Sequence, residues 1–190
     1  MMRILITLST VILLSGCANM FSRATGNQPI QTNPEGRSVG EVIDDNTLAT
    51  RIRINLAAAD DAFEQARVEV HAHAGVVLMV GQVPNGAMVN KATEVARADP
   101  QVQAVHNHLQ AKEPISMTVR TNDSWLAVKV RSRMFTTDDF PSSRVTVIVE
   151  EGVVYLMGRV SDQTARDAVR IAGEVSGVQK IVTVFTPIAS

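Results

Sequence analysis

The chain is poor in the residue types that most often reveal a function. Cys17 is the only cysteine among 190 residues, so no intramolecular disulfide forms, and one thiol does not build a metal site alone. Aromatic residues make up 4% of the sequence, so we expect aliphatic side chains, methionine and alanine to fill the core. The net charge is −1, which does not indicate a nucleic-acid-binding protein.

Motifs for catalysis are also missing. The sequence has no Ser/His/Asp arrangement, no phosphate-binding loop and no redox pair, and each of these needs particular residues at particular spacings. We therefore predict a protein that is not an enzyme and that needs no cofactor and no metal.

The N-terminus has the pattern of an export signal. Arg3 precedes an apolar run, Ile4 to Leu14, which suits a signal peptide and is too short to span a bilayer. The run ends in Leu14-Ser15-Gly16-Cys17, which resembles the bacterial lipobox. That resemblance implies a signal peptide over residues 1–16 and acylation of Cys17, with palmitate among the acyl groups. The alternative is an uncleaved anchor with an incidental cysteine.

A linker follows the lipidated cysteine. Residues 18–40 contain proline, glycine and asparagine without an apolar period, so we expect residues 17–43 to be the lipidated N-terminus and a flexible tether. Ala18 occupies the position after Cys17. By resemblance to enterobacterial lipoproteins, the absence of aspartate there favours the outer membrane, with the mature chain facing the periplasm.

The rest of the chain is an internal repeat. Residues 75–83 and 152–160 both read Gly-Val-Val followed by an apolar strand with a second glycine, and they lie 77 residues apart (152 minus 75). This spacing fits two small domains of one design rather than a solenoid. We place the domains at residues 44–113 and 122–190.

Each repeat predicts two helices and three strands. In the first, capping residues at 44–47 precede a helical spine of Leu48, Ile52 and Leu56. Strands are expected over 68–72, 76–83 and 102–111, with a second helix over 86–98. In the second, Asn122, Asp123 and Ser124 are the expected caps, with strands over 145–149, 153–160 and 178–186 and a helix over 164–175.

The second strand of each repeat is almost wholly apolar, which predicts a central position in a sheet shielded on both faces. The following helix then places the third strand parallel to it. Each domain is therefore α+β, in the order αββαβ, with a three-stranded mixed sheet and two helices on one face. Gly81 and Gly158 recur near the strand ends, which indicates a geometric need for glycine.

These patterns resemble the BON domain. The resemblance rests on the G-x-V-x-L-x-G-x-V pattern of the second strand and on V-x-x-V-x-N-x-L over residues 102–109; Thr183 replaces the asparagine in the second repeat. Two BON domains behind a lipobox are similar to the DolP family of outer-membrane lipoproteins. The family resemblance, over residues 37–190, implies a non-enzymatic role in envelope integrity, an association with cell division and phospholipid binding.

The repeats differ in chemistry on their first helices. The second repeat has Trp125, Val128 and Phe135 where the first has Thr47, Thr50 and Ala57, and basic residues lie along the same helix. An exposed tryptophan in an apolar patch beside cations suits an anionic lipid surface, at about 1 kcal/mol per cation. The predicted lipid-binding residues are Arg120, Trp125, Val128, Lys129, Arg131, Arg133 and Phe135. Packing of Trp125 on the first domain, or against a protein partner, is the alternative.

All four histidines lie in the first repeat, at His71, His73, His106 and His108. Each pair points to the sheet face away from the helices. A zinc site is conceivable, but the central strand would hold the pairs about 10 Å apart, beyond the reach of two metal bonds of about 2.1 Å. We expect this face to be solvated or to lie between the domains.

We therefore expect a non-enzymatic outer-membrane lipoprotein whose second domain binds anionic phospholipid and which supports envelope integrity. Outer-membrane or division-site envelope proteins are a further expected class of partner, and nucleic acid is not. The alternative is a periplasmic adaptor or chaperone-like module that binds envelope proteins.

Overall fold

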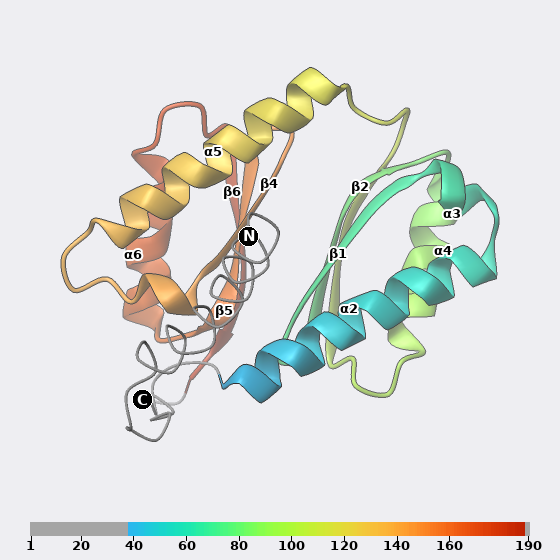
Figure 1. The fold of residues 1–190 in the computed structure, drawn as a ribbon, viewed down its shortest axis with the longest axis horizontal. Helices are drawn as coiled ribbons and strands as arrows, with labels where there is room; N and C mark the ends of the chain where they lie inside the picture. The colour runs from blue at the N-terminus through green and yellow to red at the C-terminus, as the bar shows by residue number, and fades with distance from the viewer. Residues whose placement is uncertain (1–37, 189–190) are drawn as a thin grey trace, which may run out of the picture. The chain divides into compact units, whose positions relative to one another are not determined.

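The computed structural model describes residues 38–188. The predictions for the signal peptide, for Cys17 and for the linker up to residue 37 lie outside these residues. Residues 39–43, also predicted as linker, are helical instead. Figure 1 shows the described elements. They are α2 (Val39–Ala59), α3 (Ala62–Gln65), β1 (Arg67–His73), β2 (Val76–Val83), α4 (Gly86–Arg97), β3 (Ala104–Ala111), α5 (Met117–Phe135), η1 (Ser142–Arg144), β4 (Thr146–Glu150), β5 (Val153–Val160), α6 (Asp162–Gly173) and β6 (Lys180–Pro187).

Each repeat forms one three-stranded mixed sheet, as predicted. The orders are β1-β2-β3 and β4-β5-β6, so the apolar second strand is central in both. The first strand pairs with it antiparallel and the third pairs with it parallel. The helices of each repeat cover one face of its own sheet (Figure 1).

The first helix of each domain begins five residues earlier than predicted. Ser38 caps α2: its Oγ accepts from the Glu41 amide at 3.1 Å, and Glu41 Oε2 accepts from the Ser38 amide at 2.8 Å. Ser116 caps α5 in place of residues 122–124. The capping role assigned to the acidic residues was therefore wrong. At α2, a serine three residues before a Glu is the stronger start signal.

Asp123 instead lies within α5 and is buried. Its carboxylate accepts hydrogen bonds from the Glu151 amide at 2.8 Å and from the Gly152 amide at 2.9 Å. These amides form the β4–β5 turn, where Glu151 and Gly152 both have positive φ. Asp123 thus fixes the turn to the helix, and Asp45 is buried at the corresponding position of α2.

Gly81 and Gly158 meet the predicted geometric need. A Cβ at Gly81, whose φ is +121°, would lie 2.0 Å from the Arg67 carbonyl oxygen. A Cβ at Gly158 would lie 2.2 Å from the carbonyl oxygen of Arg144. Both contacts are far inside van der Waals distance, so the backbone at the start of β1, and just before β4, approaches the central strand too closely for any side chain.

Two further short elements have no counterpart in the prediction. Helix α3 has four residues and buries Phe63 under the first sheet, and η1 precedes β4. Segments this short show no apolar period, so the periodicity that revealed the long helices could not reveal them.

Each domain has its own aliphatic core between the helices and the sheet. A third cluster joins the opposite faces of the two sheets. Its fully buried members include Leu78 and Val80 of β2 and Met157 of β5. Residues Glu35–Ser190 form one compact unit. Every residue of the three clusters lies within that unit, so we expect a fragment of residues 35–190 to fold on its own.

Candidate functional site

Helix α5 exposes a stripe of large apolar side chains. The exposed fractions are 66% for Met117, 65% for Trp125, 44% for Val128 and 79% for Phe135. At about 100° per residue, Met117, Val128 and Phe135 fall within about 20° of one another, and Trp125 is about 80° away. They therefore share the face of α5 opposite the buried Leu126, Val130 and Met134.

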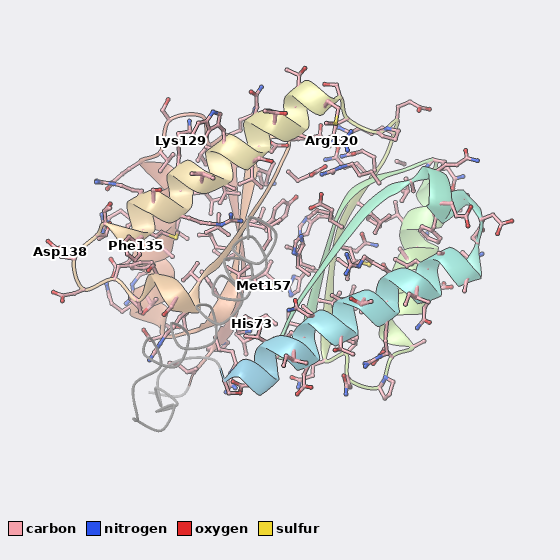
Figure 2. The ribbon with its side chains drawn as sticks, in the orientation of Figure 1. His73, Arg120, Lys129, Phe135, Asp138 and Met157 are labelled. Carbon is pink, nitrogen blue, oxygen red and sulfur yellow. The ribbon has the colours of Figure 1, made fainter. Side chains whose placement is uncertain are left out.

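The four predicted basic residues flank this stripe, and all are exposed. By the same helical geometry, Arg120 and Arg131 lie on one side and Lys129 and Arg133 on the other. Arg120, Lys129 and Phe135 are labelled along α5 in Figure 2. The structure thus brings together on one helix surface all seven residues proposed from the sequence.

Three of these cations have partners within the domain. Arg131 Nη2 donates to the Val147 carbonyl at 2.7 Å, and Lys129 Nζ donates to the Ser176 carbonyl at 2.8 Å. These neutral acceptors hold the side chains and leave their charges uncompensated. Arg133 Nη2 instead pairs with Glu174 Oε2 at 2.9 Å.

The Arg133 pair reduces the positive charge available to a partner. The hydrogen bond from Arg133, and then that from Arg170, lowers the pKa of the Glu174 carboxyl, so Glu174 is ionised at neutral pH. Because Glu174 is exposed, solvent screens this pair. Arg120 also lies near a carboxylate, because its charge contributes, after a hydrogen bond from His71 and the charges of Arg67 and His71, to lowering the pKa of Glu69. Lys129 and Arg131 are the two of the four expected cations whose hydrogen-bond partners here are backbone carbonyls rather than carboxylates.

An open groove of about 790 Å³ lies beside the first half of α5. Trp125 and Lys129 line it from the helix, Gly152 from the β4–β5 turn, and Gly177 and Gln179 from the loop before β6. All of its lining residues belong to the second repeat or to α5 itself. The indole of Trp125 is therefore not buried against the first domain.

Helix α2 gives an internal comparison within the same fold. It exposes Ile43 by 58% and Ile54 by 61%, which lie within about 20° of each other on the helix surface. Arg51 occupies the position of Lys129, but it donates to both Asp99 oxygens, at 2.9 Å and 3.1 Å. The first helix is thus also partly apolar outside, and it lacks the aromatic residues and the uncompensated cation at that position.

The four histidines lie on the sheet face that meets the second domain. The His108 ring contacts the Tyr155 ring edge-on at a centroid distance of 5.1 Å, and His73 is buried. Burial, then His106 and Lys180, lowers the pKa of His108. The register places Leu78 between His71 and His106. Within residues 38–188, no group of three His, Cys, Asp or Glu side chains is placed to hold a metal ion.

Sequence reasoning missed Met117 on α5 and Ile43 and Ile54 on α2. Met117 was missed because the start of the helix was placed at residue 122, beyond it. Ile43 lay before the predicted start of α2 for the same reason. The signal that could have revealed both is the serine cap six residues ahead of each predicted boundary.

The fold, two tandem domains that each have a three-stranded mixed sheet, defines the class of protein. The BON domain model matches residues 44–113 and 122–186. The chain therefore belongs to the BON-domain family, in the subset with two tandem domains.

Relatives narrow the class further. Outer membrane lipoprotein DolP of Haemophilus influenzae is 34% identical over 184 residues, covering 96% of this chain and 94% of that protein. The 21 kDa hemolysin of Actinobacillus pleuropneumoniae is 32% identical over 149 residues, covering 78% and 77%. Osmotically-inducible protein Y of Escherichia coli is 26% identical over 185 residues, covering 92% of each. The chain is an outer-membrane lipoprotein of the DolP family, and none of the three names denotes an enzyme.

Within residues 38–188, no helix is both long enough and apolar enough to cross a bilayer. Cys17 lies outside this range, so its acylation stays a prediction from the lipobox pattern.

Proposed function

We propose that this lipoprotein is non-enzymatic and binds anionic phospholipid at the periplasmic face of the outer membrane through α5, and that this contact supports envelope integrity. The observation that carries the proposal is the exposed stripe of Met117, Trp125, Val128 and Phe135 between two rows of cations. A helix with this distribution lies in the plane of a membrane interface, with its apolar face among the acyl chains.

The magnitudes favour lipid as the partner of this surface. Fully burying a Val, Phe or Met side chain contributes roughly 1.5–3 kcal/mol, so even partial insertion of the stripe contributes several kcal/mol. Each uncompensated cation adds about 1 kcal/mol at an anionic surface. An acyl anchor would already hold the domain near the bilayer, and that proximity raises the effective concentration of lipid.

The groove beside Trp125 fits the polar end of a lipid. Lys129 offers a cation at its edge, and Asn122 and Gln179 offer amide donors. A phosphate oxygen accepts from such donors. The apolar stripe and this groove meet at Trp125, so one lipid could place its headgroup in the groove and its acyl chains along the stripe.

A second candidate function has its own observation. The exposed Ile43 and Ile54 of α2 form an apolar strip in which Arg51 is paired with Asp99. Such a strip suits the apolar face of a protein better than an anionic membrane. An adaptor role towards envelope proteins would use α2 and leave α5 for lipid.

Vesicle binding by residues 35–190 distinguishes lipid binding through α5 from the adaptor role of α2. The fragment should sediment with vesicles containing an anionic lipid and not with neutral vesicles, with a blue shift of Trp125 emission. Trp125→Glu should abolish sedimentation, and Ile54→Glu, an equally exposed position on α2, should leave both sedimentation and the blue shift unchanged. Equal loss in the two variants, or binding that ignores lipid charge, would contradict the assignment to α5.

A further inference from the structure

Gln82 is a polar side chain in a fully buried position. It lies next to the last residue of β2 and is 0% exposed. It shares a row of the sheet with Arg67 on β1, on the face that meets the second domain. A buried amide must find partners for its donors and its acceptor, so the direction of its hydrogen bonds shows what it holds.

All hydrogen bonds of this amide leave the first domain. Nε2 donates to Glu150 Oε1 at 2.6 Å and to Glu151 Oε1 at 3.1 Å. Oε1 accepts from the amide of Ile115 at 3.3 Å. Carboxylates only accept hydrogen bonds and a backbone amide only donates, so one orientation of the side chain satisfies all three.

Both groups of partners lead directly to α5. Ile115 precedes Ser116, the cap of α5. Glu151 is the residue of the β4–β5 turn whose amide donates to Asp123 in the middle of α5. Gln82 is therefore bonded to the entry of the helix and, through one turn, to its centre.

Two cations, Arg67 and Lys112, also bind the glutamates that accept from Gln82. Arg67 Nη1 donates to Glu150 Oε1 at 2.5 Å, and Lys112 Nζ donates to Glu151 Oε2 at 2.5 Å. Burial acts to lower the pKa of Arg67, and its bond to Glu150 together with the charges of Glu150, Glu69 and Asp123 outweighs this, so that the pKa is raised. Glu150 is 2% exposed, and removing one partner of a buried ion pair is strongly destabilising.

The internal repeat shows that this role is particular to Gln82. With the 77-residue offset, the equivalent residue of β5 is Arg159, which is exposed. The fold therefore does not require a buried amide at this position. The first domain has one where it meets the second.

We propose that Gln82 is a positioning residue: through Ile115 and the β4–β5 turn it sets the placement of α5, so that the first domain controls how the second presents its lipid-binding face. This inference rests on the proposed function for its lipid readout and on the hydrogen-bond network for its structural readout. By linkage, lipid bound at α5 stabilises the same network, because coupling between two sites is reciprocal.

Amide hydrogen exchange of the fragment tests the structural part without lipid. Gln82→Met keeps the volume and removes all three hydrogen bonds. The amides of Ile115, Glu151 and Gly152 should then exchange about tenfold faster, while amides in the core of the first domain change much less. Arg159→Met, at the equivalent position, should leave these three rates within about twofold. Unchanged exchange at Ile115 and Glu151, or equally faster exchange throughout both domains, would overturn the proposal.

Vesicle binding tests the functional part. Gln82→Met should weaken binding to anionic vesicles by roughly threefold to tenfold, although Gln82 is buried and does not reach the membrane. Wild-type affinity in a folded Gln82→Met fragment would refute the inference and leave the proposed function intact. Failure of the wild-type fragment to bind any anionic vesicle would refute the proposed function, and the exchange rates would still decide the role of Gln82.

A second variant serves if Gln82→Met does not fold. Glu151→Ala removes a half-buried carboxylate that accepts from Gln82 and Lys112, and it preserves the backbone amide that donates to Asp123. Faster exchange at Gly152 and Ile115 is the expected result, and unchanged exchange at both residues would count against the proposal.

Discussion

Gly81 is a position in the first domain where a neighbouring backbone leaves no room for a side chain. Its φ of +121° and the carbonyl oxygen of Arg67, 2.0 Å from where a Cβ would lie, both exclude a side chain. The carbonyl belongs to the first residue of β1, so it cannot move without disturbing the pairing of β1 with β2. Arg67 also binds Glu150, which links this glycine to the interface.

Gly81→Ala should therefore destabilise the protein strongly. The backbone strain and the clash together should lower the free energy of unfolding by about 3 kcal/mol or more, measured by urea denaturation. Gly86→Ala is the control, because nothing lies within 4 Å of a Cβ there and α4 begins at that residue. Similar losses for both variants would show that the close contact is not the cause.

Asp99 is the residue whose titration should be visible in the stability. The hydrogen bond from Arg51 lowers the pKa of the Asp99 carboxyl. Burial opposes this effect, and a hydrogen bond from the Gln101 amide adds to it. A carboxyl group whose pKa is lowered by folding stabilises the protein at pH values above its ordinary pKa of about 4. This stabilisation is lost as the pH falls through the pKa of the folded state. Asp99→Asn should cost about 1 kcal/mol at pH 7, since Arg51 is partly exposed.

The difference between wild type and Asp99→Asn should be constant from about pH 5 to pH 8 and should shrink below about pH 4. Urea unfolding at a series of pH values measures it. A difference that grows on acidification would mean that Asp99 is not held ionised by Arg51.

At the scale of the element, α5 and α2 are the equivalent helices of the two repeats, and their outward-facing side chains differ. Their buried spines match, and both are capped by serine. Only α5 has the large apolar side chains of Trp125, Val128 and Phe135. The two helices also differ at one aligned cation, because Lys129 of α5 bonds to a backbone carbonyl whereas Arg51 of α2 forms an ion pair. This difference on an unchanged scaffold is what supports the proposed lipid binding by the second domain.

The ion pair of Arg133 gives a direct test of charge on α5. Glu174→Ala releases Arg133, so affinity for anionic vesicles should rise about fivefold, the equivalent of about 1 kcal/mol per cation. Asp167→Ala removes a carboxylate from the same part of the domain, where it contacts Arg170 and not Arg133. If the two variants gain affinity equally, net charge and not Arg133 determines the effect.

The sequence predicted most of the elements, and its errors have physical causes. Repetition of the apolar strands at residues 76–83 and 153–160 identified the central strands, because only shielded strands lack polar alternation. The starts of α2 and α5 were misplaced because an aspartate near the start of an apolar spine was interpreted as a cap. Asp123 is instead a side chain that holds a turn distant in sequence, and a local pattern cannot show such a contact.

At the scale of the whole molecule, the contact between the sheets could not be derived from the sequence. The histidine-bearing face was expected to be solvated or to lie between domains, and the structure shows the second alternative at His108 and Tyr155. The interface consists of an aliphatic cluster around Leu78 and Met157 and of the polar cluster around Gln82 and Glu150. Which faces meet depends on side chains from both repeats at once.

This interface should make the two domains unfold together. In wild type, NMR resonances of both domains should disappear in one urea transition. Leu78→Asp places a carboxylate in the buried aliphatic cluster, where loss of hydration opposes its charge, so the transition should split into two. Leu78→Met keeps the volume and the polarity and should preserve the single transition. A wild-type protein whose domains already unfold separately would contradict the structural role of this interface.

The depth of Trp125 in a membrane tests the central claim most directly. Trp125 is the only tryptophan, so its fluorescence reports on α5 alone. With residues 35–190 on anionic vesicles whose acyl chains carry bromine, emission should be quenched most by bromine near the headgroups and little by bromine at the chain ends, as for a helix in the interface plane. Bound protein with no quenching at any depth would show that the membrane contact lies elsewhere than α5.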